Sequence, residues 1–214
     1  MIKVGINGFG RIGRLILRAI LENYKNKIQV VAINDLGSIE TNAHLIKYDS
    51  THGTINEDIQ TSNDGFKISN QNIKVFAERD PASIPWGKVG ADVVLECTGI
   101  FLDKKSAEKH IKAGAKKVII SAPAKEVDFT IVQGVNSKEL KKEHNIISNG
   151  SCTTNCLAPV AMVLEKNFGI SYGYMTTIHS YTGDQKLLDT LHKDLRRARS
   201  TEGAMIPTST GAAK

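Results

Sequence analysis

The chain has 214 residues, of which 41% are hydrophobic and 23% charged, and 28 Lys and Arg against 22 Asp and Glu give a net charge of +6. This composition excludes a disordered or collagen-like chain, and the lack of an apolar run near 18 residues argues against a transmembrane helix. Three cysteines, an odd number, and a first segment without a signal-peptide pattern favour a reducing compartment, the cytoplasm. The positive charge suits an anionic partner, either a phosphorylated substrate or a nucleic acid.

Short apolar runs alternate with segments of helical spacing from the first residues onward. The expected order is a strand at 2–7, a helix at 11–24, a strand at 28–34, a short helix at 41–50, antiparallel hairpins over 55–77, a loop at 81–87, a strand at 91–98, a helix at 106–113, and strands at 117–121, 129–132 and 145–148. Strands that are apolar on both faces and separated by helices indicate a parallel sheet. The predicted fold class is therefore α/β, with a Rossmann-type doubly wound, mostly parallel sheet.

The chain changes character near Gly150. A helix is expected at 152–166 and a strand at 175–179, followed by a basic, polar stretch. We therefore expect two domains, 1–150 and 151–214. The second of these is too short to be complete, which predicts that the chain is a piece of a longer protein.

The segment Gly8-Phe9-Gly10-Arg11-Ile12-Gly13 follows a predicted strand and opens a predicted helix. In a dinucleotide site the first glycine permits a tight turn, the second lets a pyrophosphate approach the backbone, and the third allows close packing of the helix. Asp35 lies 22 residues after Gly13, where an acid that binds the adenosine ribose is expected. A carboxylate there would repel a 2′-phosphate, so NAD is favoured over NADP. The alternative is a glycine-rich turn without a ligand.

Cys152 opens the predicted helix 152–166, where amide groups and the macrodipole lower the pKa of a thiol. The flanking hydroxyls of Ser151 and Thr153 are suited to an anion. Cys156 lies one turn further along and is interpreted as a buried small residue. Zinc binding by Cys152 and Cys156 needs further ligands at suitable spacing, and the sequence offers none, so no metal is expected.

His179 ends the predicted strand 175–179, and a cysteine nucleophile needs a base or an ion-pair partner. The other histidines are interpreted as structural. A basic run, Arg196-Arg197-Ala198-Arg199, has no interleaved aromatic residues, so a small phosphate fits it better than a nucleic acid.

These segments together resemble the phosphorylating glyceraldehyde-3-phosphate dehydrogenases over the whole chain. The resemblance is carried by the segments 4–13, 32–35, 151–156 (Ser-Cys-Thr-Thr-Asn-Cys), 179–182, 194–199 and 210–214. Two positions depart from the pattern: Gly150 replaces the usual Ala, and Thr190-Leu191 replaces the Leu-Pro common in NAD-specific bacterial members. The family's chains are considerably longer, so the resemblance implies that an α+β catalytic domain begins at residue 151 and is incomplete here.

The resemblance also implies roles for individual residues. Cys152 corresponds to the nucleophile and His179 to the catalytic base. Cofactor contacts are implied for Asn7, Gly8, Phe9, Gly10, Arg11, Ile12, Asp35, Arg79, Thr98, Gly99 and Ser121. Inorganic phosphate is implied at Ser151, Thr153, Thr210 and Gly211, and the substrate phosphate at Thr182 and Arg197.

The implied reaction is the NAD-dependent oxidation and phosphorylation of glyceraldehyde 3-phosphate to 1,3-bisphosphoglycerate, a step of glycolysis. It implies a Cys152 thioester, a homotetramer of full-length chains, and neither a membrane nor a nucleic acid as primary partner. Two alternatives remain open: an enzyme like erythrose-4-phosphate dehydrogenase, and a catalytically incompetent fragment that binds NAD.

Overall fold

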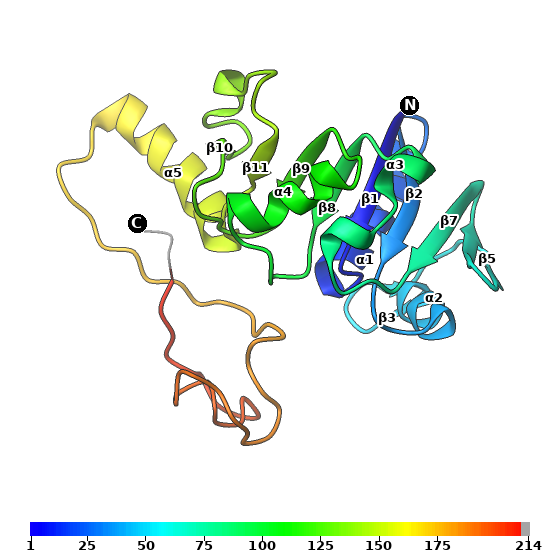
Figure 1. Ribbon diagram of the computed structural model, residues 1–214. Helices are drawn as coiled ribbons and strands as arrows, with labels where there is room; N and C mark the ends of the chain where they lie inside the picture. The colour runs from blue at the N-terminus through cyan, green and yellow to red at the C-terminus, as the bar shows by residue number, and fades with distance from the viewer. Residues whose placement is uncertain (211–214) are drawn as a thin grey trace. The chain divides into compact units, whose positions relative to one another are not determined.

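The computed structural model describes residues 1–210 and divides the chain into two compact units, 1–150 and 151–214 (Figure 1). The first unit contains a nine-stranded sheet with helices, and the second contains helix α5 and an irregular segment. None of the helices in the described part of the chain is long and apolar enough to cross a membrane.

The sheet of the first unit is mostly parallel. Its spatial order is β10-β11-β9-β8-β1-β2-β7-β6-β5. Every neighbouring pair from β10 to β7 is parallel, whereas β7, β6 and β5 pair antiparallel as the expected hairpins. The strands are β1 (Ile2–Asn7), β2 (Ile28–Asn34), β5 (Ile59–Ser62), β6 (Gly65–Ile68), β7 (Gln71–Phe76), β8 (Val93–Glu96), β9 (Lys117–Ile120), β10 (Phe129–Thr130) and β11 (Ile146–Ser148), beside a small separate pair, β3 (Tyr48–Asp49) and β4 (Gly53–Thr54).

The predicted helices occur in the expected order, with shifted ends that have local causes, whereas the predicted loop at 81–87 contains a helical turn and the start of a short helix. The oxygens of Ser38 and Asp103 accept hydrogen bonds from the third residue beyond them, so their helices begin two residues earlier than predicted. The elements are α1 (Arg11–Ala19), the π-helical turn η1 (Ile20–Tyr24) that continues it, α2 (Ile39–Lys47), η2 (Pro81–Ser83), α3 (Trp86–Val89), α4 (Lys104–Lys112), η3 (Ser137–Glu139) and α5 (Cys152–Phe168).

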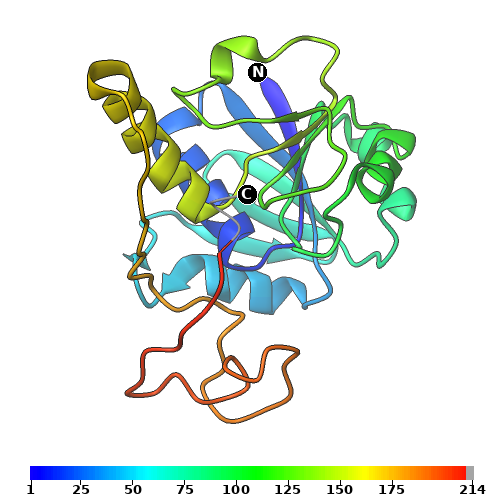
Figure 2. The ribbon, with the colours of Figure 1, turned by 90° about the vertical axis from the view of Figure 1, so that its left-hand side faces the viewer.

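Helices cover both faces of the sheet, whose central strands β1 and β2 run side by side in both views (Figures 1 and 2). On β2, Ile33 packs with residues of α1 and α2, whereas the preceding residue, Ala32, packs with Trp86 of α3. Successive side chains of a strand point to opposite faces, so α1 and α2 cover one face and α3 the other. The predicted doubly wound α/β class is confirmed.

The expected strand at 175–179 is wrong. The described residues after α5 contain no helix or strand, and Ile178 is 97% exposed. A strand needs a neighbour to accept and donate its backbone hydrogen bonds, and no described segment of the second unit lies beside this one as a strand. An apolar, β-branched sequence alone is therefore insufficient here.

Candidate functional site

The glycine-rich turn between β1 and α1 has a separate reason for each glycine. Gly8 has φ +87°, in the left-handed region that favours glycine. A Cβ on Gly13 would lie 2.3 Å from the carbonyl oxygen of Gly8, so α1 reaches the turn because Gly13 lacks a side chain. A Cβ on Gly10 would meet no described atom within 4 Å, so the backbone there faces open space. This arrangement fits a dinucleotide whose pyrophosphate approaches Gly10.

The start of α1 is suited to an anion. No side chain of the described residues caps the helix at Gly10, so its first amides have no side-chain acceptor. Amides at a helix N-terminus, with the macrodipole behind them, attract phosphate. The residues present therefore fit the phosphates of a dinucleotide.

A cleft of about 430 Å³ lies beside this turn, where β1, β2, β7 and β8 end. Ligands of open α/β sheets bind at the carboxyl ends of the strands. Six of the predicted cofactor residues line the cleft: Asn7, Gly8, Gly10, Asp35, Arg79 and Thr98.

Asp35 is fixed by backbone amides on both of its oxygens. Oδ2 accepts from the amide of Phe9 at 2.8 Å, and Oδ1 accepts from the amide of Gly37 at 2.8 Å. Each carboxylate oxygen can accept a further hydrogen bond. Asp35 therefore combines a fixed position with remaining acceptor capacity toward ribose hydroxyls.

The other predicted cofactor residues do not line the cleft. The Arg11 guanidinium lies 2.7 Å from Asp49, and the pKa of Asp49 is held well below its usual range by the His52 amide and by Arg11, against the effect of burial. Ser121 contacts the thiol of Cys97. Phe9 is buried, Ile12 is 49% exposed, and Gly99 has φ +72°.

Gly10→Ala and Gly13→Ala form a matched pair that separates binding from folding. Gly13→Ala places its Cβ against the Gly8 carbonyl and is expected to destabilise the fold by about 1–3 kcal/mol or more. Gly10→Ala, at φ −68°, is expected to leave the melting temperature nearly unchanged but to weaken NAD binding about tenfold or more, because its methyl group occupies the open space. Thermal melting and calorimetric titration with NAD measure both effects. Unaltered NAD affinity in Gly10→Ala would show that the cofactor does not approach this backbone.

In the second unit, Cys152 is the first residue of α5. The Ser151 hydroxyl caps this helix by accepting from the amide of Thr154 at 2.9 Å. Cys152 is exposed, and the Thr153 hydroxyl lies 4.0 Å from its sulfur. The thiol is thus placed at the positive end of a 17-residue helix dipole.

His179 lies beside this thiol. Its Nε2 is 3.1 Å from Cys152 Sγ, and its Nδ1 is 2.6 Å from the carbonyl oxygen of Ser180. Partial burial raises the pKa of Cys152, but the hydrogen bonds from His179 and Thr153 outweigh it and lower that pKa below its ordinary value. The pKa of His179 is raised by the Ser180 carbonyl and then by Cys152. Both shifts favour a thiolate–imidazolium pair.

The predicted substrate-phosphate residues, Thr182 and Arg197, both contact Asp184. The Arg197 guanidinium pairs with the Asp184 carboxylate, and the Asp184 amide lies 3.4 Å from the Thr182 hydroxyl. Thr182 also donates to the side-chain oxygen of Gln185 at 2.8 Å. A phosphate at Arg197 would have to compete with the carboxylate of Asp184.

Of the residues predicted for inorganic phosphate, Ser151 and Thr153 lie at the start of α5 beside Cys152. Thr210 is the last described residue and has an interaction within the chain. Gly211 lies outside the described residues.

A separate cavity of about 300 Å³ in this unit is lined by His179, Tyr181, Gln185 and neighbouring residues.

Two cysteines differ from Cys152 in their surroundings. Cys97 lines the nucleotide cleft, and burial raises its pKa to about 12. The interpretation of Cys156 as buried is wrong: it is exposed on α5, because no other element of the described second unit packs over that turn. No group of three potential metal ligands occurs within residues 1–210.

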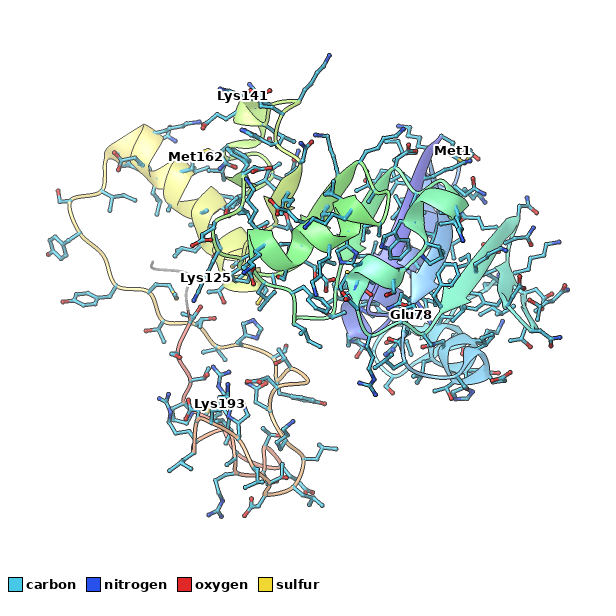
Figure 3. The ribbon with its side chains drawn as sticks, in the orientation of Figure 1. Met1, Glu78, Lys125, Lys141, Met162 and Lys193 are labelled. Atoms are coloured by element: carbon cyan, nitrogen blue, oxygen red, sulfur yellow. The ribbon has the colours of Figure 1, made fainter. Side chains whose placement is uncertain are left out.

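Sequence reasoning missed several residues that line the cleft. They come from the end of β2 and from the segments that follow β2, β7 and β8, and Glu78, labelled in Figure 3, is one of them. Their positions at or just beyond the ends of predicted strands were a usable signal, because strand ends meet at one edge of a parallel sheet. The missed residues are Asn34, Leu36, Glu78, Cys97, Ile100 and Phe101.

Comparison with protein families adds an independent finding. The NAD binding domain of glyceraldehyde 3-phosphate dehydrogenase matches residues 2–104, and the C-terminal domain of the same enzyme matches residues 151–214. The chain belongs to the glyceraldehyde 3-phosphate dehydrogenase family. The resemblance stated from the sequence is thereby confirmed, and the first unit carries the family's NAD binding domain.

Curated members of the family align along the whole chain. A glyceraldehyde-3-phosphate dehydrogenase of Xanthobacter flavus is 57% identical over 213 residues, and one of Bacillus cereus is 56% identical over 215 residues. One of Streptomyces coelicolor is 56% identical over 214 residues. These alignments cover 100% of this chain but 63–64% of each relative, so the chain spans less than two thirds of the length of these family members.

Proposed function

We propose that the full-length protein containing this chain oxidises glyceraldehyde 3-phosphate with NAD and joins the product to inorganic phosphate. The observation that carries this proposal is the 3.1 Å approach of Cys152 Sγ to His179 Nε2 at the start of α5. The names of the relatives support the choice of substrate. The reaction converts an aldehyde, phosphate and NAD into an acyl phosphate, NADH and a proton.

Cys152 is the proposed nucleophile. Its thiolate attacks the aldehyde carbon, forming a carbon–sulfur bond and leaving the charge on the former carbonyl oxygen. Amides at the start of α5 are suited to stabilise that oxyanion. The lowered pKa of Cys152 keeps the attacking species available at neutral pH.

His179 is the proposed acid–base group. It protonates the oxyanion after attack and removes the same proton when the carbon is oxidised to a thioester. Its Nδ1 contact with the Ser180 carbonyl holds the ring so that Nε2 faces the sulfur. NAD, when bound, accepts the hydride that leaves this carbon.

Phosphate completes the cycle. Its oxygen attacks the thioester carbon, the carbon–sulfur bond breaks, and Cys152 leaves as the thiolate. We assign this phosphate to Ser151, Thr153, Thr210 and Gly211, and the substrate phosphate to Thr182 and Arg197. A planar guanidinium binds phosphate through paired hydrogen bonds, which supports the assignment of Arg197.

The cofactor would be held by the cleft of the first unit. Its phosphates would lie against the amides at the start of α1, and its adenosine ribose against Asp35. The open backbone at Gly10 and the remaining acceptor capacity of Asp35 support this placement.

Turnover tests the proposal directly. The full-length protein is expected to reduce NAD with glyceraldehyde 3-phosphate only when phosphate or arsenate is present, and to use erythrose 4-phosphate far less well. Faster turnover of erythrose 4-phosphate would overturn the proposed substrate. Reduction of NAD in the absence of phosphate and arsenate would overturn the proposed thioester route.

Asp35 is expected to make NAD preferred over NADP about tenfold or more, because a 2′-phosphate would face its carboxylate. Asp35→Gly is expected to narrow this ratio, because it weakens the binding of NAD and removes the repulsion of the 2′-phosphate of NADP. Titration of both nucleotides measures it. Equal binding of the two by the unchanged protein would show that Asp35 does not meet the ribose.

We further propose a homotetramer of full-length chains in the cytoplasm, with neither nucleic acid nor a membrane as primary partner. Family membership supports the assembly, and three free cysteines support a reducing compartment. Light scattering of the full-length protein tests the assembly, and a monomeric mass would contradict it.

A further inference from the structure

A buried carboxylate, Glu96 at the end of β8, accepts four hydrogen bonds. Its Oε2 accepts from Asn7 Nδ2 at 2.6 Å and is 2.9 Å from His110 Nε2. Its Oε1 accepts from the amide of Thr98 at 2.8 Å and from the Thr98 hydroxyl. Glu96 is 1% exposed, so the energy of burying this carboxylate depends on these donors. Two of the donating residues, Asn7 and Thr98, line the nucleotide cleft.

The proton on His110 is placed by a tryptophan. The indole N–H of Trp86 lies 3.0 Å from His110 Nδ1, and both side chains are fully buried. An indole only donates, so Nδ1 must accept and the ring proton is on Nε2, where it donates to Glu96. A proton on Nδ1 as well would point at the indole N–H and remove the acceptor of this hydrogen bond. Trp86 of α3 thus fixes the ring of His110 of α4, which donates to Glu96 and also packs edge-on against Phe101, a residue that lines the cleft.

Glu96 also sets the orientation of two asparagine amides. Because the carboxylate accepts, Asn7 turns its NH₂ group toward Glu96 and its oxygen toward Asn34 Nδ2, 2.8 Å away. Asn34 then accepts from the Glu78 amide at 2.8 Å and donates to the Glu78 carbonyl at 2.9 Å. Glu78, labelled in Figure 3, directly precedes Arg79. One carboxylate therefore fixes the donors and acceptors along this edge of the cleft.

We propose that Glu96 is a positioning residue for NAD, and that His110 and Trp86 hold Glu96 in turn. The network presents Asn7, Thr98 and the segment before Arg79 to the dinucleotide in one fixed arrangement. None of Glu96, His110 and Trp86 is among the predicted site residues. The inference rests on the proposed binding of NAD in this cleft.

Two substitutions at His110 separate the two halves of the network. His110→Gln places an amide nitrogen near the position of Nε2, so it keeps a donor to Glu96 and removes the acceptor of Trp86. His110→Asn places its oxygen near the position of Nδ1, so it keeps that acceptor and removes the donor to Glu96. NAD affinity is measured by calorimetry on the 214-residue chain, and Trp86, its single tryptophan, reports the indole contact by fluorescence.

Glu96→Gln and Gln71→Met complete the series. In Glu96→Gln, an NH₂ group replaces one carboxylate oxygen and faces groups that donate to Glu96 in the unchanged chain. Because this disturbs the arrangement of the cleft residues, NAD binding is expected to weaken about tenfold or more. Gln71 is also buried and accepts from the Val30 amide at 2.9 Å, but it does not line the cleft. Gln71→Met therefore controls for the general loss of one buried hydrogen bond. Circular dichroism establishes the temperature at which all variants are folded.

The positioning role is supported if Glu96→Gln and His110→Asn weaken NAD binding about tenfold while His110→Gln and Gln71→Met bind within about twofold of the unchanged chain. His110→Gln should then shift the Trp86 emission without changing affinity. Equal affinity in all folded variants, or equal weakening by both His110 substitutions or by Gln71→Met, would overturn it. An unchanged chain that fails to bind NAD would overturn the proposed cofactor site instead.

Discussion

Limiting iodoacetamide at pH 7 is expected to label Cys152 at least about tenfold faster than Cys97. Burial raises the pKa of Cys97 to about 12, whereas the contacts of Cys152 lower its pKa below the ordinary value. At pH 7 the thiolate fraction of Cys152 then exceeds that of Cys97 by more than about 10³-fold. The more basic thiolate of Cys97 is the stronger nucleophile, but this offsets only part of the difference in labelling rate. Peptide mapping after partial alkylation measures the ratio.

The pH dependence of this labelling tests the contact between Cys152 and His179. The thiolate is present above the lowered pKa of Cys152 and is lost as the pH falls through it, and the imidazolium persists up to the raised pKa of His179. His179→Asn is expected to move the loss of labelling to higher pH, because the hydrogen bond and charge that stabilise the thiolate are removed. Label spread evenly over the three cysteines would contradict an activated Cys152.

Cys152→Ser is expected to lower the dehydrogenase activity of the full-length protein by about 10³-fold or more, because a serine hydroxyl is not ionised at neutral pH and forms no thioester. His179→Asn is expected to lower kcat by about 10²–10⁴-fold, the usual contribution of a general acid–base group. NADH formation with glyceraldehyde 3-phosphate and phosphate measures both losses, and NAD titration measures cofactor binding separately.

Cys156→Ser is the matched control for these losses. It lies one turn further along the same helix, is exposed, and takes no part in the proposed chemistry. Its activity is expected to remain within about twofold of the unchanged protein. A loss in Cys156→Ser as large as in Cys152→Ser would place the nucleophile elsewhere, and substantial activity in Cys152→Ser would exclude a thioester.

The alternation of apolar runs and helical spacing by itself determined the order and class of elements in the first unit. Residues that are apolar on both faces of a strand can be buried only between two layers, which makes a doubly wound sheet the expected result. The glycine spacing after β1 and the acid after β2 likewise predicted where a dinucleotide would lie. Each of these features depends on residues close together in the sequence.

Contacts between distant residues were decided by the tertiary structure alone. Arg11 pairs with Asp49 and does not line the nucleotide cleft. Asn34, at the end of β2, accepts a hydrogen bond from the amide of Glu78, after β7, and both residues line the cleft. The segment 175–179 has strand-like side chains, but a strand exists only where a neighbour supplies hydrogen bonds. Whether a residue is buried, paired or exposed depends on partners far along the chain, and periodicity within one segment carries no information about those partners.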